Sequence, residues 1–182
     1  MMLEVGSKDS YDSFEEYLFA LWLQSASEFI YTAHYHPDPF RLFEARDGLR
    51  DHVYTADWRV LWRENARGLY FIREDDKVLK KRSHEATVPF IGNPTYIDIK
   101  GGFVGKNNSS GITFPLNQKW IMDKYGVLVN KTVISYEKKG LFFKTYAPES
   151  VLETSNYVRT GLTKFKFQPR TLDEFKKSGV IL

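Results

Sequence analysis

The sequence has 182 residues and a mass of 21.3 kDa, the usual size of a single domain. Its 42% hydrophobic and 16% aromatic content supplies a packed core and excludes an intrinsically disordered or fibrous protein. The lack of cysteine excludes disulfides, thiolate zinc sites and cysteine nucleophiles. We expect a soluble, cytoplasmic protein, because the apolar runs fall far short of the roughly 20 residues of a membrane span and the N-terminus lacks the apolar segment of a signal peptide.

The formal net charge is only +3, so its distribution is more informative than its size. Residues 1–130 carry 16 Lys and Arg against 18 Asp and Glu, whereas residues 131–182 carry 10 against 5. A basic C-terminal segment is typical of nucleic-acid binding, but a solvated surface gives the same count.

A helix is predicted from Asp9 to about Glu28, because apolar residues recur there at the spacing of one helix face. Ser13 and Glu16 have the spacing of a capping box, so the helix could begin at Ser13, with Asp9 or Ser10 as an earlier cap. A breaker follows at 36–39, where two prolines occur.

The middle of the chain reads mainly as strands. Residues 40–43 form a possible short strand, and Asp47-Gly48 is a turn signal that leads into 52–62, the longest strand candidate. Further elements are predicted in this order: a hairpin turn at 63–67 into 68–72, an exposed charged excursion at 73–94, a strand at 95–100, a mobile loop at 101–113, a second helix at 115–125 and a strand at 127–134.

The C-terminal part is predicted to be a small basic extension, 135–182, packed on a core of residues 1–134. It contains a hairpin-like stretch at 138–140, an irregular or helical piece at 148–157, a basic run at 164–170 and a short helix at 171–178. This order of helices and strands predicts an α/β fold with a mixed sheet flanked by helices.

Two aspartates lie inside apolar strand sequences, Asp57 and Asp98. A buried carboxylate is costly without a partner, and two on adjacent strands would repel each other unless a cation lay between them. Oxygen ligands without cysteine favour a hard ion such as Mg²⁺ or Mn²⁺. Strand periodicity places Lys100 on the same face as Asp98, about 6.6 Å along the strand, where an ammonium could orient water or stabilise charge on a phosphate. These features are typical of phosphodiester hydrolysis.

The set of motifs resembles the PD-(D/E)XK nuclease superfamily: Glu16 on an N-terminal helix, Asp57 on a strand, Asp98-Ile99-Lys100 on a following strand, and Gln118-Lys119 on a later helix. It looks closest to phage-encoded endonuclease-related proteins and is similar in element order to Tn7-type transposon-end endonucleases. The resemblance covers residues 10–134 and implies a restriction-endonuclease-like fold. Ala56 stands where the proline of the superfamily name is expected, and the 40 residues between Asp57 and Asp98 require an insertion at 73–94.

The resemblance implies one or two Mg²⁺ or Mn²⁺ ions held by Asp57, Asp98 and the Ile99 carbonyl, with Glu16 holding a metal or its water. Lys100 would position the attacking water, and Gln118 or Lys119 would support the phosphate. The acid on the helix stays open between Glu16, which the family pattern prefers, and Glu15, which lies nearer the edge of the apolar stripe.

Several basic residues are candidates for nucleic-acid contacts. Lys106 lies in the 101–113 loop, and Lys164, Lys166 and Arg170 alternate with aromatic residues. The same alternation is equally typical of a half-buried strand. His34 and His36, with Asp38, could be read as metal ligands, but two histidines without a third strong ligand are more typical of surface residues.

Two functions are carried forward. The first is a metal-dependent DNA endonuclease of phage or mobile-element metabolism, working in a bacterial or phage-infected cell, with DNA as partner and no membrane. A homodimer and a complex with a partner protein are both left open. The alternative is a non-catalytic nucleic-acid-binding or assembly module with a nuclease-like fold. The complete set Glu16, Asp57, Asp98 and Lys100 favours the enzyme, because a decayed site would have lost a member.

Overall fold

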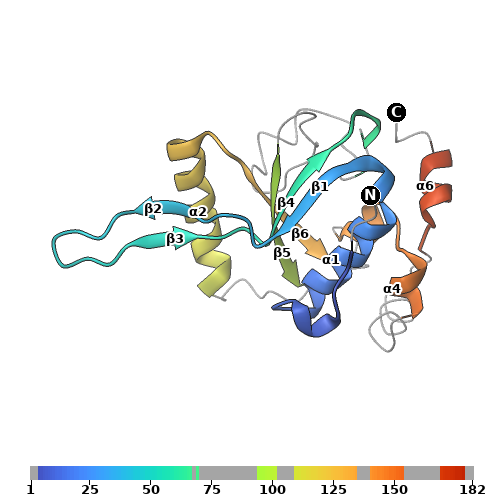
Figure 1. The fold of residues 1–182 in the computed structure, drawn as a ribbon, viewed down its shortest axis with the longest axis horizontal. Coiled ribbons are helices and arrows are strands. Elements are labelled where there is room, and N and C mark those ends of the chain that lie inside the picture. The colour runs from blue at the N-terminus through green and yellow to red at the C-terminus, as the bar shows by residue number, and fades with distance from the viewer. Residues whose placement is uncertain are drawn as a thin grey trace.

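The computed structural model describes residues 4–66, 69, 94–101, 109–134, 140–153 and 169–178, and they form a mixed α/β structure (Figure 1). The longer helices are α1 (Phe14–Ser25) and α2 (Ser109–Tyr125), and the short ones are α3 (Leu141–Lys144), α4 (Glu149–Glu153) and α6 (Leu172–Lys177). The strands are β1 (Ile30–Tyr35), β2 (Phe40–Phe43), β3 (His52–Tyr54), β4 (Trp58–Trp62), β5 (Thr95–Gly101) and β6 (Val129–Ile134). Single 3₁₀ turns lie at Lys8–Ser10, Ser27–Phe29 and Glu64–Ala66.

The main sheet has four strands in the order β1-β4-β5-β6. β4 is antiparallel to both β1 and β5, while β6 runs parallel to β5. A parallel neighbour needs a crossover connection, and α2 lies in the segment that joins β5 to β6. The predicted α/β class with a mixed sheet is therefore confirmed.

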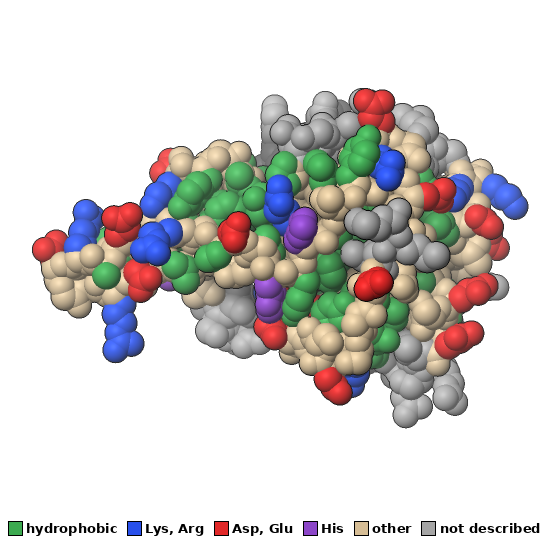
Figure 2. All heavy atoms as spheres, viewed as in Figure 1, with side chains coloured by type: hydrophobic (Ala, Val, Ile, Leu, Met, Phe, Trp, Pro, Cys, Tyr) green, Lys and Arg blue, Asp and Glu red, His purple; other side chains and the backbone are tan. Residues whose placement is uncertain are grey.

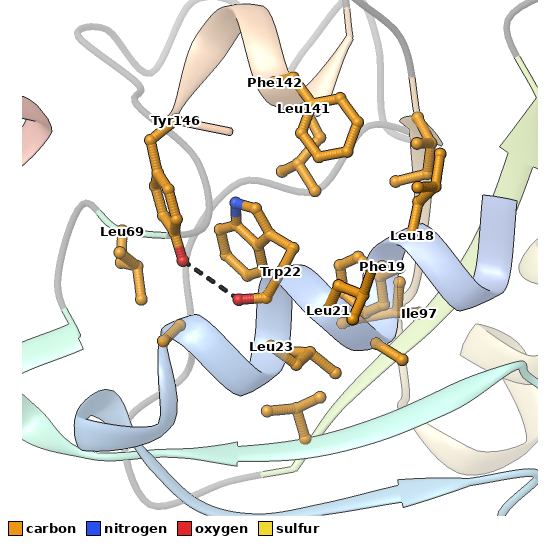
Figure 3. Close-up of a cluster of buried hydrophobic side chains, with 14 of the residues drawn as sticks. Leu18, Phe19, Leu21, Trp22, Leu23, Leu69, Ile97, Leu141, Phe142 and Tyr146 are labelled. Atoms are coloured by element: carbon orange, nitrogen blue, oxygen red, sulfur yellow. Dashed lines mark hydrogen bonds between the residues drawn. The ribbon is translucent and has the colours of Figure 1, made fainter. Parts of the chain in front are cut away.

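α1 is buried almost all round, so the apolar face expected from the sequence is wider than one stripe. Six consecutive residues, 18–23, are each at most 7% exposed. Trp22 stacks on Phe19 and Tyr146 with ring centroids 5.7 and 5.3 Å apart, and the Tyr146 hydroxyl donates to the Trp22 carbonyl at 3.1 Å (Figure 3). This cluster joins α1, β4, β5 and the C-terminal helices into the main core.

A smaller second core lies under α2. Phe114 and Ile121 of α2 are buried against Phe40 and Leu42 of β2 and Val129 of β6. α2 thus packs against both the main sheet and the two-stranded sheet of β2 and β3.

β2 and β3 form an arm that projects from the body of the molecule beside α2 (Figure 1). Its predicted turn is confirmed: Asp47 and Gly48 have φ values of 51° and 78°, and the backbones of Arg46 and Leu49 bond to each other across them. Positive φ at both central residues suits the right-handed twist of the flanking strands. Acidic and basic side chains are mixed along the arm (Figure 2).

Two expectations need correction, and one strand was not predicted. The single strand predicted at 52–62 is two strands in different sheets, because the chain bends at Thr55–Asp57 where the arm joins the main sheet. α2 begins at Ser109, so the end of the loop predicted at 101–113 is helical and Pro115 lies inside the helix. β1 was not predicted from the sequence. In the structure it pairs with β4 and forms one edge of the main sheet. Outside the described residues lie 102–108 of the predicted loop, 68 and 70–72 of the strand predicted at 68–72, and 73–93 of the excursion predicted at 73–94.

The C-terminal elements pack on the same core as α1. Leu141, Phe142, Tyr146, Val151 and Phe175 are at most 1% exposed. The short helix expected at 171–178 is confirmed as α6, with a full capping box between Thr171 and Glu174. Among the described residues, no helix is long and apolar enough to cross a membrane.

Candidate active site

Asp57 and Asp98 face each other across two neighbouring strands. The β4–β5 register pairs Trp58 with Ile97, and the next residue along each strand is Asp57 and Asp98. Asp57 lies in the bend before β4, where its Oδ2 accepts a hydrogen bond from the Ile99 amide at 2.5 Å. The β4–β5 pairing ends at Trp58 and Ile97, so the Ile99 amide donates to the Asp57 side chain instead of to a backbone carbonyl of β4.

Burial beside Asp98 changes the acidity of Asp57. Desolvation is the largest cause, and the negative charge of Asp98 adds to it, so that the pKa of Asp57 rises to about 7. The Ile99 amide and the Lys100 ammonium lower the pKa in part, whereas the charge of Glu16 raises it further. The negative charges of Asp98 and Glu16 therefore both act on Asp57 at this end of strands β4 and β5.

Lys100 and Tyr54 both hold the Asp98 side chain, which is only 3% exposed. The Lys100 ammonium forms an ion pair with Asp98 Oδ1, as the predicted shared strand face requires. The Tyr54 hydroxyl, from the end of the arm, donates to Asp98 Oδ2, and burial together with the Asp98 charge raises the pKa of Tyr54. Lys100 also lies over the ring of Phe114 in α2.

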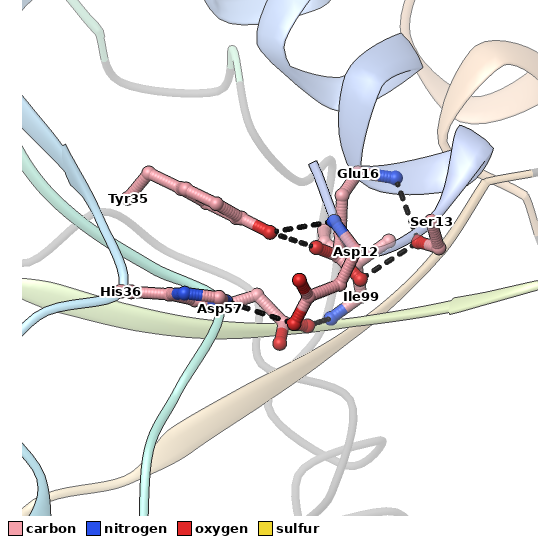
Figure 4. A network of polar contacts seen from close by, with 7 residues as sticks. All are labelled: Asp12, Ser13, Glu16, Tyr35, His36, Asp57 and Ile99. Atoms are coloured by element: carbon pink, nitrogen blue, oxygen red, sulfur yellow. Dashed lines mark hydrogen bonds and ion pairs between the residues drawn. The ribbon is translucent and has the colours of Figure 1, made fainter. Parts of the chain in front are cut away.

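Glu16 is the helix acid that the structure brings to this site. It is 7% exposed, whereas Glu15 is half-buried on another side of α1. The Tyr35 hydroxyl donates to Glu16 Oε2 at 2.5 Å and the Ser13 hydroxyl donates to Oε1 at 2.7 Å (Figure 4). Ser13 also caps α1 by accepting from the Glu16 amide at 3.2 Å, so the cap predicted at Ser13 fixes both the helix start and its acid.

The sequence did not predict the neighbours of Glu16 on its solvent side. His36 directly follows β1, and its amide donates to the Asp57 carbonyl at 2.9 Å. Its imidazole lies 3.5 Å from a carboxylate oxygen of Asp12, and the two side chains are 42% and 76% exposed. His36 is thus a surface residue as expected, but its acidic neighbours are Asp12 and Glu16 rather than Asp38.

Gln118 and Lys119, the two residues of α2 predicted to support the phosphate, lie in different surroundings. The Gln118 amide nitrogen donates to the Val129 carbonyl at 2.6 Å, so this buried side chain joins α2 to β6. Lys119 is exposed and lines a cavity of about 330 Å³ with Gln118, Met122, Asp123 and Leu128. The role of either residue at a phosphate stays a prediction.

The other predicted nucleic-acid contacts are only partly described. The Arg170 guanidinium donates hydrogen bonds to the carbonyls of Phe143 and Lys144 at 3.4 and 3.0 Å and lies over the ring of Phe175. These contacts join the segment before α6 to α3. Lys106, Lys164 and Lys166 lie outside the described residues.

The donor set suits a hard cation. Asp57, Asp98 and Glu16 offer carboxylate oxygens, the ligands that Mg²⁺ and Mn²⁺ prefer. Burial and the charge of Asp98 raise the pKa of Asp57, and a bound cation would favour its ionised form again. Ile99 is held at the site through its amide, which keeps its peptide group next to both aspartates.

Comparison with protein families, curated proteins and solved structures finds no match to this chain. The interpretation of the site therefore depends on its own geometry and chemistry.

Proposed function

We propose that the protein is a metal-dependent DNA endonuclease of the PD-(D/E)XK type with a restriction-endonuclease-like fold. The observation that carries this proposal is the meeting of Glu16, Asp57, Asp98 and Lys100, which come from α1, the bend before β4, and β5. The order of these elements is the order that the resemblance implies. The proposal includes DNA as partner and an intracellular site of action.

Asp57, Asp98 and the backbone carbonyl of Ile99 would hold the metal ion, with Glu16 holding a metal or its water. When bound, Mg²⁺ or Mn²⁺ supplies a Lewis acid and lowers the pKa of a water molecule. Hydrolysis joins a water oxygen to phosphorus and breaks one phosphate ester bond; the attacking water gives up a proton and the leaving oxygen takes one up. Lys100 stands beside Asp98, where its ammonium would orient the water and stabilise the negative charge that develops on the phosphate.

The hydroxyls of the site act as positioning groups. Tyr54 fixes the Asp98 carboxylate, and Tyr35 and Ser13 fix Glu16. Groups that orient metal ligands in this way tune affinity and geometry without touching the substrate.

The test is cleavage of supercoiled, linear, single-stranded and four-way-junction DNA with Mg²⁺ or Mn²⁺. We expect the wild type to cut at least one substrate, and Asp98→Asn and Lys100→Ala to lose a factor of about 10² to 10³ in rate, as other groups acting in the transition state do. Asp173→Asn and Lys177→Ala on α6, away from the site (Figure 1), should keep full activity and serve as matched controls.

Folding of each variant is checked by circular dichroism. A wild type that cuts none of the substrates and binds no divalent ion contradicts the enzyme. Salt-sensitive DNA binding without cleavage, unchanged by Asp98→Asn and Lys100→Ala, would instead favour the non-catalytic nucleic-acid-binding module.

A further inference from the structure

A second group of possible ligands lies on the solvent side of Glu16. Asp12 directly precedes the α1 cap, Glu16 lies in the first turn of α1, and His36 is the first residue after β1. One ligand atom from each residue lies within 4.8 Å of the others (Figure 4). The group combines two carboxylates with an imidazole, which distinguishes it from the all-oxygen set of Asp57 and Asp98.

The imidazole of His36 is held in place by the backbone and by stacking. His36 has a φ of 47°, in the left-handed region where Asn, Asp and His are enriched among non-glycine residues. Its ring stacks on Tyr35 with centroids 3.9 Å apart, and Tyr35 in turn donates to Glu16.

Among the described residues, no cation balances the charge of Glu16. Its side-chain hydrogen-bond donors there, Ser13 and Tyr35, are neutral hydroxyls, and no Lys or Arg of the described segments forms an ion pair with it. A carboxylate that is 93% buried is costly under these conditions. Since a carboxylate has about four lone-pair sites, its two bonds leave room for a metal ion.

We propose that Asp12, Glu16 and His36 bind a divalent transition-metal ion, Mn²⁺ or Zn²⁺, next to the Asp57–Asp98 site, with Glu16 on the border of both. An imidazole ligand favours these ions over Mg²⁺. Three protein ligands leave coordination positions for water. The binding itself is independent of the nuclease activity; only its use beside Asp57 and Asp98 depends on the proposed function.

The experiment counts Mn²⁺ ions bound to the full chain by electron paramagnetic resonance. We expect two ions for the wild type and one for His36→Asn, with at least a tenfold weaker affinity at the lost site. Asparagine tolerates the left-handed backbone, so this variant keeps the local fold. His34→Asn, which changes an exposed histidine on the same strand, should still bind two ions.

Asp12→Asn is a second variant that leaves β1 untouched and should also lose one ion. In wild type, Mn²⁺ should broaden the imidazole resonances of His36 and leave those of exposed His34 sharper. If His36→Asn and Asp12→Asn bind as many ions as wild type with unchanged affinity, the second site is wrong.

The Asp98→Asn variant separates this inference from the proposed nuclease site. Loss of an ion in Asp98→Asn but in neither His36→Asn nor Asp12→Asn would remove the second site and leave the nuclease site standing. Loss in His36→Asn but not in Asp98→Asn would support the second site and count against the Asp57–Asp98 metal site.

Discussion

The Asp57 carboxyl binds its proton more tightly in the folded chain than in the unfolded chain. Its pKa rises from 3.8 to about 7, first through burial and then through the charge of Asp98. Between about pH 4 and pH 7 the folded state therefore holds a proton that the unfolded state has lost. Without divalent ions, this group makes stability fall as the pH rises through that range and level off above about pH 7.

Replacement of Asp57 by Asn should remove this dependence, because the amide cannot ionise. At pH 8 in a chelator, we expect Asp57→Asn to be more stable than wild type by up to about 4 kcal/mol, the upper limit for a difference of about three pH units. At pH 4.5 the two proteins should be similar. Urea unfolding at both pH values measures this, and equal stability of the two proteins at pH 8 would contradict it.

Tyr54 should matter to metal binding through Asp98. Tyr54→Phe keeps the ring but removes the hydroxyl that donates to the carboxylate, so we expect metal affinity to fall about 10- to 100-fold. Isothermal titration with Mn²⁺ measures the change. Tyr31→Phe, on an exposed ring of β1, is the matched control and should bind Mn²⁺ as wild type does.

At the scale of elements, the start of α1 links helix stability to the site. Ser13→Ala removes the N-cap and one hydrogen bond to Glu16, whereas Thr171→Ala removes the N-cap of α6 alone. Each should lower the free energy of unfolding by about 1 kcal/mol. Only Ser13→Ala should also weaken Mn²⁺ binding, and equal binding by the two variants would show that the cap does not position Glu16.

The sheet brings the acids together by its register. His36 follows the last β1–β4 pair, and Asp57 and Asp98 lie one residue beyond the last β4–β5 pair, so the register brings together three residues far apart in the sequence. The chain enters β4 from the arm at this point, and in the bend there the Asp57 side chain accepts the hydrogen bond from the Ile99 amide. The site therefore lies where the ladder between β4 and β5 ends.

At the scale of the whole molecule, the main core crosses the boundary predicted after residue 134. Phe175 is fully buried against Tyr146, and both belong to the cluster built on α1. Phe175→Ala should cost about 3–5 kcal/mol of stability, while Phe143→Ala, at a 38% exposed position, should cost much less. Urea unfolding of both variants tests this.

Removal of residues 135–182 should prevent cooperative folding, because α1 would lose the partners of Trp22. A fragment of residues 1–134 that unfolds in one sharp transition would instead support the division into a core and an added extension.

Local patterns in the sequence determined the elements whose signals lie within a few residues. The cap at Ser13, the Asp47-Gly48 turn, the strand around 95–100 and the helix after Thr171 agree with the structure. The shared face of Asp98 and Lys100 also follows from sequence, because strand periodicity alone sets it.

Only the tertiary structure decided which distant residues meet. It selected Glu16 over Glu15, directed Gln118 to the Val129 carbonyl, and brought His36 to Asp12. It also divided 52–62 between two sheets. Periodicity fixes the direction of a side chain within its own element, but the residue that it meets depends on how elements far apart in the chain pack and pair.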